Sequence, residues 1–492
     1  MSLPGRYLRR QLRTPGPAGR SLRRRLVAPL ALAVVASGVA VAFPAAASAA
    51  PVPASDAPKR VVTAYFADWD VYGRGYFVKD IPATKLNVIQ YAFGVPGYDP
   101  ATGAASCDIL DPWADYQQVY WTGDDTVDGV ADDPANPDQH LFGNFNQLAK
   151  LKAKYPNLKI EISLGGWTKS TWFSTLASTP QLRQQFVSSC IDTFIKGNLP
   201  GGGWPESAGG VGAAAGLFDG IDLDWEYPTQ VAGGNVDVSP ADRHNATLLA
   251  AEFRRQLDAY GKKTGKHYLL TAALPAAQNS TRYFELSQFS KYLDWDNVMT
   301  YDFNVPSGTV AGPDTLFLPD PRDPAGSVNG SPKDPTWNTV GTVTWYLTHG
   351  VPASKIVVGV PFYANEYLNS TGLYSAFDNT GLDANSLVWD QTPQPSYHAL
   401  ADEAGIAGGG SGYTLHWNAF AGEPYLTNPA AIHVLSNGTT VTAPTTIVFS
   451  SPQSIGERTA LVRLLGLRGA MAWEISQDSD THALIGALSP LL

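Results

Sequence analysis

The sequence has few cysteines, little positive charge and no long apolar run, and each shortage excludes a class of protein. Two cysteines among 492 residues, Cys107 and Cys190, allow one disulfide at most. The one extended apolar run, residues 27–43, has 17 residues and contains Pro29, which disfavours a membrane-spanning helix. With 44% hydrophobic residues and no internal repeat, coiled coil or low-complexity tract after the first fifty residues, we expect a globular protein with a large core.

The first fifty residues differ in composition from the rest. Residues 1–26 contain eight Arg and no acidic residue, and the apolar run is followed by an Ala-rich end. This order predicts a secretory signal peptide at residues 1–49, with cleavage near Ala49 or Ala50, and then a Pro/Ala linker at residues 50–59. Three arginines before the run also suit twin-arginine export, and the sequence leaves this route and the general one open. We expect a secreted, extracellular protein.

Removal of that segment leaves 26 basic and 44 acidic residues, a formal net charge of −18. Such a chain should not attract nucleic acid or an anionic membrane, and a neutral substrate is expected. In an oxidising compartment a disulfide between Cys107 and Cys190 is favoured, although a buried free thiol would be equally ordinary for Cys190 in its helical stretch. The sequence does not decide the oligomeric state, and a monomer is expected.

From residue 60 onward, strand-like apolar runs alternate with amphipathic helical stretches, a pattern typical of a parallel sheet. The eight expected strands are residues 61–66, 87–94, 158–165, 218–226, 268–274, 297–303, 356–362 and 468–474. Helices are expected at residues 145–155, 182–196, 339–348 and 454–465, and another should start with Ser239 as N-cap and Pro240 in its first turn. This order predicts an α/β fold, a (β/α)8 TIM barrel over residues 60–492, with its chemistry at the carboxyl ends of the strands.

Two connections are too long for plain barrel loops. Residues 99–144 form an insertion after the second strand that contains several Trp and Tyr residues. Residues 366–444, between the seventh and eighth strands, are rich in Gly and Tyr and predict a small α+β insertion domain.

The clearest chemical pattern lies at residues 218–228, Phe-Asp-Gly-Ile-Asp-Leu-Asp-Trp-Glu-Tyr-Pro. In a strand Asp222, Asp224 and Glu226 share one face, and the apolar residues between them share the other. Burial and like charge both disfavour ionisation, so at least one carboxyl group should keep its proton near neutral pH and could serve as a general acid. A solvated edge strand is disfavoured by the aromatic residues around Glu226. The central Gly and twelfth-position Glu of a calcium loop are absent, so we expect no metal and no cofactor.

Aromatic and polar side chains gather at the other strand ends. A single aromatic residue is more often part of a core, but several at one face of a barrel suit the stacking of a sugar ring. The candidate residues are Tyr65, Trp69, Phe93, Trp167, Tyr227, Met299, Tyr301, Asp302 and Trp473.

With these residues the chain resembles a bacterial-type chitinase of glycoside hydrolase family 18. The fourth strand matches the family signature Asp-x-x-Asp-x-Asp-x-Glu, from Asp219 to Glu226. A Ser-x-Gly-Gly motif starts at Ser163, and a Met-x-Tyr-Asp motif starts at Met299. The matching region runs from about residue 60 to the C-terminus.

The resemblance implies a role for each acidic residue. Glu226 would protonate the glycosidic oxygen, and the substrate's own acetamido oxygen would attack, giving an oxazolinium ion and net retention. Asp224 would orient the acetamido N–H, and Asp222 would be its buried partner, sharing a proton or hydrogen bond with it. Tyr301 would hold the acetamido oxygen in line. Asp219 has the opposite strand parity, and we expect it to be structural.

For the substrate the resemblance implies chitin or chito-oligosaccharides. Trp473 would form the floor under the sugar at the cleavage point, Trp167 and Trp69 would be outer platforms, and Tyr65, Phe93, Tyr227, Met299 and Asp302 would support the same site. Many relatives carry Gly-Arg where this chain has Ala364-Asn365, so one cationic sugar contact is expected to be missing. Chain-end preference, endo or exo action and the pH optimum stay open.

Two other functions fit the same fold. An endo-β-N-acetylglucosaminidase acting on N-glycan cores would share the mechanism, but usually lacks the long insertion at residues 366–444. A sugar-binding lectin typically loses the acid, whereas Glu226 is present.

Overall fold

The structure, a computed structural model, describes residues 57–324, 334–382 and 392–492. The predicted signal peptide, its cleavage point and residues 50–56 of the predicted linker lie outside the described residues.

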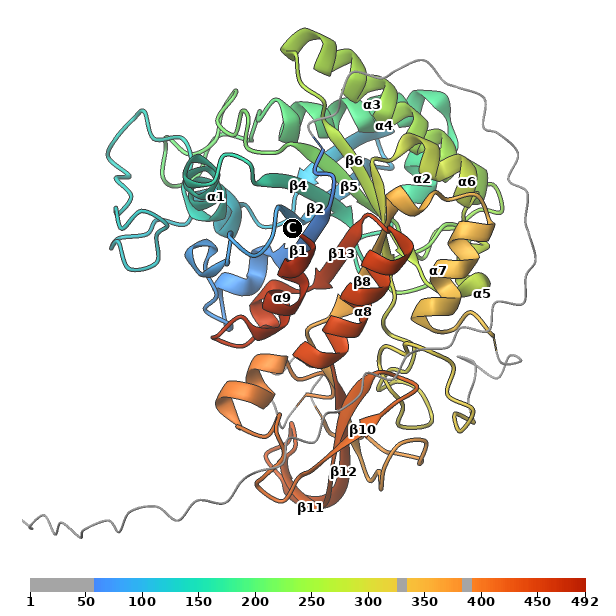
Figure 1. The fold of residues 1–492 in the computed structure, drawn as a ribbon. Helices are drawn as coiled ribbons and strands as arrows, with labels where there is room; N and C mark the ends of the chain where they lie inside the picture. The colour runs from blue at the N-terminus through green and yellow to red at the C-terminus, as the bar shows by residue number, and fades with distance from the viewer. Residues whose placement is uncertain (1–56, 325–333, 383–391) are drawn as a thin grey trace, which may run out of the picture. The chain divides into compact units, whose positions relative to one another are not determined.

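Eight parallel strands form a closed barrel at the centre of the ribbon (Figure 1). Each strand pairs with the next, and β1 pairs with both β2 and β13, which closes the ring. The barrel strands are β1 (Val61–Ala67), β2 (Val88–Asp99), β4 (Lys159–Gly165), β5 (Gly220–Asp224), β6 (Leu269–Pro275), β7 (Trp295–Met299), β8 (Ile356–Pro361) and β13 (Gly469–Trp473). The predicted (β/α)8 barrel is therefore confirmed.

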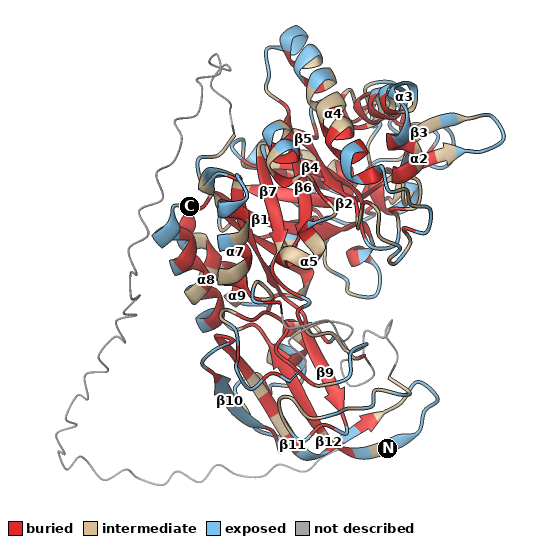
Figure 2. Cartoon of the chain, turned by 90° about the vertical axis from the view of Figure 1, so that its right-hand side faces the viewer, coloured by how far each residue is buried: buried red, intermediate tan, exposed pale blue. Residues whose placement is uncertain are grey.

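Helices surround the ring of strands, and the main hydrophobic core lies between the two layers (Figures 1 and 2). The α-helices are α1 (Gly143–Lys154), α2 (Phe173–Ser178), α3 (Pro180–Cys190), α4 (Asp242–Thr264), α5 (Ala277–Thr281), α6 (Leu286–Phe289), α7 (Thr339–Thr348), α8 (Pro452–Leu465) and α9 (Ala483–Leu488). The barrel strands are buried on both faces because one face packs on these helices and the other fills the barrel. Local signals set the helix ends: Ser451 caps α8, Pro452 opens it, and Gly466 ends it at a φ of 64°.

Several predicted boundaries differ from those of the structure, and two of the errors have a local cause. The sixth barrel strand, β7, spans Trp295–Met299 and not residues 297–303, because Asp302 takes a φ of 57° and the chain leaves the sheet before Tyr301. Helix α4 begins at Asp242 and not after Ser239. The Asp242 carboxyl accepts from the Ser239 amide at 2.6 Å, so residues 239–241 form a turn in front of the helix.

The insertion after the second barrel strand begins with a hairpin. Strand β3 (Ala104–Ile109) pairs antiparallel with the end of β2 and contacts α3. Cys107 of β3 and Cys190 of α3 are both buried and form a disulfide, so the favoured pairing is confirmed. The insertion thus has a covalent link to the barrel's helical layer.

A second, antiparallel sheet lies in sequence between β8 and β13. Its strands, in the order β10-β11-β12-β9, are β9 (Ala364–Leu368), β10 (Thr414–Asn418), β11 (Glu423–Val434) and β12 (Thr440–Phe449). The fully buried Arg458 of α8 fastens this sheet to the barrel, because its guanidinium donates to the carbonyls of Thr315, Ala421 and Gly422. This sheet lies where the sequence predicts an insertion domain, and the domain with its limits 366–444 stays a prediction.

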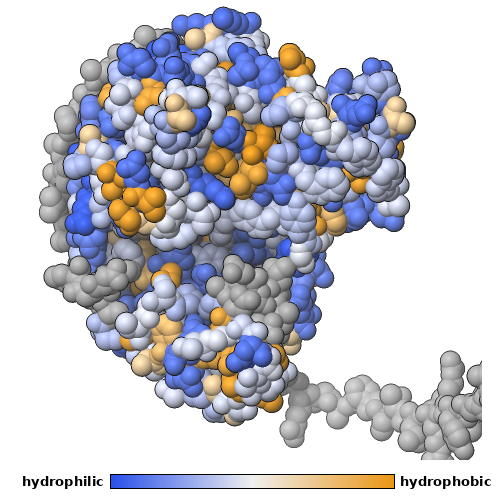
Figure 3. Space-filling view, turned by 180° about the vertical axis from the view of Figure 1, so that it is seen from behind, coloured by the Kyte–Doolittle hydropathy of each residue, from blue (hydrophilic) through white to orange (hydrophobic). Residues whose placement is uncertain are grey.

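Within the described ranges, the helices are too short or too polar to cross a bilayer. On the face drawn in Figure 3, hydrophobic side chains form small separate patches among hydrophilic ones. Patches of that kind are ordinary for a globular surface.

Candidate active site

Strand β5 places the acidic residues as its alternation predicts. Asp222 and Asp224 are buried and point into the barrel, whereas Ile221, Leu223 and Trp225 belong to the core between strands and helices. Glu226 follows two residues after the strand and is partly exposed. The three carboxyl groups therefore form a column that runs from the barrel interior to its carboxyl edge.

Asp222, at the base of the column, accepts hydrogen bonds from four donors. Tyr65 and Ser163 donate to Oδ2 at 2.9 and 2.8 Å, and Thr271 and Asn297 donate to Oδ1 at 2.6 and 3.2 Å. Burial raises the pKa of Asp222, and these hydrogen bonds oppose that rise. All four hydrogen-bond partners of Asp222 are neutral side chains. A hydrogen bond between Asp222 and Asp224, one form of the expected partnership, is not among the contacts of the described residues.

Asp224 is buried, and its Oδ1 has no hydrogen-bond partner among the described residues. Burial raises its pKa well above the ordinary range, and the charges of Glu226 and Asp222 raise it further. An acceptor left without a donor in a buried place costs about 1–3 kcal/mol. This oxygen is therefore ready to receive a donor from a ligand.

Glu226 lies at the top of the column, where it can reach a ligand. Burial raises its pKa to about 7, an interaction with the Tyr227 hydroxyl opposes the rise, and the charge of Asp302 adds to it. A carboxyl group with a pKa near neutrality can both give and take a proton during one reaction cycle. Glu226 thus has the property that the sequence predicted for one member of the strand.

Tyr301 and Asp302 follow β7 and face this column from another side of the barrel. Tyr301 is buried beside Met471, with its ring edge-on to Tyr363 at 6.3 Å between centroids. Asp302 is exposed, and its Oδ1 accepts from the Tyr363 hydroxyl at 2.6 Å. The backbone N–H of Asp302 donates to Asp314, which orients the carboxyl group.

Aromatic rings line the neighbouring strand ends. Trp473 lies 5.9 Å from Phe93 in a stacked pair and 5.3 Å from Tyr65, and Trp69 lies 6.1 Å from Phe93. Trp69 is 44% exposed, whereas Tyr65 and Phe93 are buried, so the row runs from the barrel interior to its surface. Met299 also packs in this inner cluster.

Trp167 stands apart from that row. Its ring is 53% exposed, and it makes no ring pair with the described aromatic residues. Its carbonyl accepts from the Gly234 amide at 2.7 Å, and a side chain at position 233 would collide with the indole. The loop around Gly233 therefore braces Trp167 as an exposed flat surface.

The remaining motif residues have structural contacts. Asp219 forms an ion pair with Lys152 at 2.6 Å on the outer side of the barrel, as its strand parity predicts. Asn365, at the position of the missing arginine, is buried and donates to Asp314 Oδ1 and to the carbonyl of Asn304. Asn365 thus supports the Asp302 loop from behind.

Sequence reasoning missed Thr271, Asn297 and Tyr363 as site residues. Thr271 and Asn297 are polar residues at buried, inward positions of their strands, a signal that could have singled them out. Tyr363 follows β8 directly, where barrel enzymes place functional residues.

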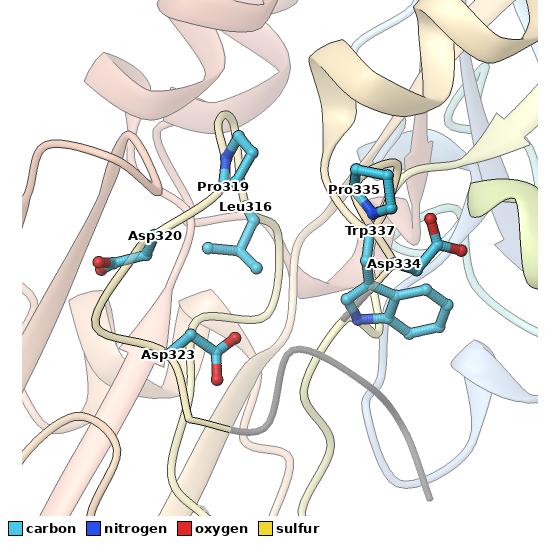
Figure 4. A pocket seen from close by; sticks show the side chains of 7 residues that line it. All are labelled: Leu316, Pro319, Asp320, Asp323, Asp334, Pro335 and Trp337. Carbon is cyan, nitrogen blue, oxygen red and sulfur yellow. The ribbon is translucent and has the colours of Figure 1, made fainter. Parts of the chain in front are cut away.

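Two other features of the described residues lie outside this site. His398, Asp402 and Asp480 have ligand atoms within 4.8 Å of one another, but both carboxyl groups are exposed and none of the three belongs to the acidic column. A cavity of about 290 Å³ opens beside the loop after β7, with acidic residues on its opposite walls (Figure 4). Its lining residues are Leu316, Pro319, Asp320, Asp323, Asp334, Pro335 and Trp337. Because Asp320 and Asp334 already accept hydrogen bonds from protein donors, we assign the cavity no ligand.

An acidic column at the carboxyl edge of a (β/α)8 barrel, edged by aromatic rings, defines a barrel enzyme of the glycoside hydrolase class. Residues 61–478 match the family model Glycosyl hydrolases family 18. The chain belongs to this family.

Named relatives agree with that assignment. The chain is 33% identical over 456 residues to Chitinase A1 of Niallia circulans, covering 87% of this chain and 58% of the relative. It is 34% identical over 423 residues to Chitinase C of Streptomyces lividans, covering 84% and 57% respectively. The solved catalytic domain of psychrophilic chitinase B from Arthrobacter TAD20 superposes with a TM-score of 0.72 at 32% identity, over 89% of this chain and 97% of that one. The chain thus spans somewhat more than half the length of the two relatives from Niallia circulans and Streptomyces lividans.

Proposed function

We propose that this protein is a secreted, monomeric chitinase that hydrolyses β-1,4 linkages between N-acetylglucosamine units. The observation that carries the proposal is Glu226, a carboxyl group with a pKa of about 7 above two buried aspartates. The export signal at residues 1–49 and the insertion domain at residues 366–444 belong to the same proposal.

In the first step Glu226 donates its proton to the glycosidic oxygen, and the bond from that oxygen to the anomeric carbon breaks. The acetamido oxygen of the same sugar bonds to that carbon and gives an oxazolinium ion. In the second step water attacks the anomeric carbon, the bond from that carbon to the acetamido oxygen breaks, and the attacking water gives a proton to the Glu226 carboxylate. In favourable cases, a nucleophile that belongs to the substrate and is held in line lowers the activation free energy of a reaction by roughly 7–11 kcal/mol.

Asp224 and Tyr301 act on the acetamido group. The unpaired Oδ1 of Asp224 accepts the acetamido N–H, which supplies the donor that the free protein lacks. The Tyr301 hydroxyl, whose one hydrogen-bond partner among the described residues is the sulfur of Met471 at 3.8 Å, is available to the acetamido oxygen. Asp222 stays in the barrel, and its charge raises the pKa of Asp224.

Aromatic rings bind the sugars on both sides of the cleavage point. Trp473 lies under the sugar that reacts, with Phe93, Tyr65, Met299, Tyr227 and Asp302 around it. Trp69 and Trp167, both exposed, stack on sugars further along the chain.

The test is product identification by mass spectrometry. The mature protein is incubated with chitin oligomers and, separately, with a high-mannose glycoprotein. Release of the N-acetylglucosamine disaccharide from the oligomers supports the proposal. Release of N-glycans instead would assign an endo-β-N-acetylglucosaminidase, and binding without cleavage would assign a lectin.

A further inference from the structure

The barrel interior beneath Asp222 holds a second buried carboxyl group that the proposed mechanism does not use. Glu161 lies on β4 and is fully buried. Two residues further along β4, Ser163 is the strand partner of Asp222, so Glu161 lies one inward step deeper in the barrel. A buried carboxyl group is unfavourable unless hydrogen bonds satisfy it, so the partners of Glu161 beside the acidic column indicate its role.

One hydroxyl group joins the two acids. Thr271 Oγ1 on β6 lies 2.6 Å from Asp222 Oδ1 and 3.2 Å from Glu161 Oε1. Gln90 on β2 donates its amide Nε2 to Glu161 Oε2 at 3.2 Å and to Thr271 Oγ1 at 3.3 Å. Asn297 on β7 donates to Asp222 Oδ1 and to Gln90 Oε1.

The protons available for these hydrogen bonds decide whether Asp222 and Glu161 are ionised or neutral. A threonine hydroxyl has one proton to donate and two lone pairs to accept with. Because Thr271 Oγ1 lies 2.6 Å from Asp222 Oδ1, we assign the hydroxyl proton of Thr271 to that hydrogen bond. The two oxygens of Asp222 then accept four hydrogen bonds, which occupy all their lone pairs and leave none for a proton on Asp222 itself. The 3.2 Å contact between Thr271 and Glu161 is a hydrogen bond only if Glu161 is the donor, and Glu161 can donate only as a neutral acid.

With Glu161 neutral, every amide and hydroxyl proton of this network has an acceptor. Gln90 uses both amide protons, Asn297 uses both of its own, and Asn297 Oδ1 accepts from the Trp295 indole at 3.0 Å. With Glu161 ionised, two anionic oxygens would compete for one threonine proton in a buried place.

The charges around Glu161 act in the same direction. The ionisable groups whose charges act on it are all acidic: Asp222 in the barrel interior on β5, Asp294 before β7, and Asp219 before β5 on the outer side of the barrel. Among the described residues no salt bridge involves Glu161. Burial raises the pKa of Glu161 well above its ordinary value, and Asp222 raises it further.

We propose that Glu161 is a positioning residue for catalysis: a permanently neutral acid that donates to Thr271, so that Thr271 in turn donates to Asp222 and keeps Asp222 a carboxylate. The inference rests on the proposed function, because Asp222 acts through Asp224. The retained charge of Asp222 raises the pKa of Asp224 and so keeps a proton on that residue until substrate arrives.

The first test asks for the proton itself and needs no activity. The infrared difference spectrum between the wild-type protein and Glu161→Gln, at neutral pH, should contain the carbonyl band of one protonated carboxyl group. Glu423→Gln is the matched control, because Glu423 is a buried carboxyl of the antiparallel sheet with a pKa of about 8. The Glu423→Gln variant should lose a different carbonyl band, the one that belongs to the protonated carboxyl group of Glu423. A spectrum with a carboxylate band at position 161 would overturn the proposal.

The second test separates positioning from packing through kcat and KM on chito-oligosaccharides. Glu161→Gln keeps an N–H for Thr271 and a carbonyl for Gln90, and should keep kcat within about threefold of wild type. Glu161→Met keeps the volume but removes the donor, and should lower kcat at least about tenfold with KM little changed. Glu423→Gln should leave both unchanged. Equal kcat in Glu161→Met and Glu161→Gln would overturn the inference. A wild-type protein that cleaves no oligomer would overturn the proposed function, while the infrared test would still decide the state of Glu161.

Discussion

Glu226 and Asp302 show how single residues tune the chemistry of the site. Glu226 is deep enough for burial to raise its pKa to about 7, yet exposed enough to reach a ligand. Asp302 is exposed at the edge of the same site, and its charge disfavours ionisation of Glu226. Each property can be tested by one substitution.

Glu226→Gln should lower kcat by several orders of magnitude, because the amide has the shape of the acid but no proton to give. Binding of chito-oligosaccharides should stay near that of the wild type, since the aromatic rings are unchanged. Turnover and calorimetric binding are measured on the same preparation. Near-normal turnover in this variant would remove Glu226 as the acid.

Asp302→Asn should move the alkaline limb of kcat/KM to lower pH. The acid must be protonated, so activity of the wild type should fall as pH rises above about 7. Removing the negative charge of Asp302 makes ionisation of Glu226 easier and lowers its pKa. The pH–rate profiles of both proteins give the shift. A limb that moves to higher pH would contradict the assigned cause.

The acidic column could be predicted from the sequence because strand alternation alone decides which of its residues share a face. Its surroundings could not be. Thr271 and Asn297 reach Asp222 from other strands, and their contacts depend on the register and tilt of a closed barrel. Tyr363 reaches Asp302 from a strand end 61 residues away. A local sequence pattern does not predict contacts between residues so far apart in the chain.

At the scale of elements, the long periodic segments were predicted well and their ends less so. Helix α7 spans the predicted residues 339–348, because Asn338 caps it through the Gly341 amide. The start of β7 was predicted two residues late, because the polar Asp296 follows Trp295 and interrupts the apolar pattern at the start of the strand. Polar residues that serve a buried network thus hide a strand from pattern reasoning.

The disulfide between β3 and α3 is the element-scale feature with the largest expected effect on stability. Cys107 and Cys190 are 83 residues apart in sequence, and a loop of that length suggests a contribution of about 4.5 kcal/mol. Cys107→Ala/Cys190→Ala should therefore lower Tm clearly. The kcat at room temperature should stay unchanged, because neither residue touches the acidic column.

Calorimetry of the double variant and of the reduced wild-type protein measures the effect. The reduced protein serves as a control for the cavity that alanine would leave at these buried positions. An unchanged Tm in both samples would mean that packing alone holds β3 to α3.

At the scale of the whole molecule, acidic residues are both abundant and deeply placed. Two of the buried carboxyl groups show what such groups do away from the site: Asp314 holds Asp302 and Asn365, and Glu423 lies beside Arg458 where the antiparallel sheet meets the barrel. Arg458 faces three acids from a fully buried position. The barrel and its insertion are therefore joined by a charged, hydrogen-bonded layer as well as by apolar packing.

These buried acids predict that the protein is more stable at mildly acidic than at mildly alkaline pH. Burial raises four pKa values far above those of the unfolded chain: to about 6 for Asp296, to about 7 for Asp68 and Glu226, and to about 8 for Glu423. Between the unfolded and folded values the native state binds more protons, so the free energy of unfolding falls as pH rises. The stability from these groups is complete below about pH 4 and is lost as pH passes through about 6 to 8. Carboxyl groups with lowered pKa values, such as Glu252 and Asp192, lose their contribution only below that range and do not oppose the trend.

Tm measured by calorimetry should therefore fall by several degrees between about pH 5 and about pH 8. Glu423→Gln should reduce the fall, because glutamine does not titrate. A Tm that rises over this interval would mean that these carboxyl groups are ionised in the folded protein.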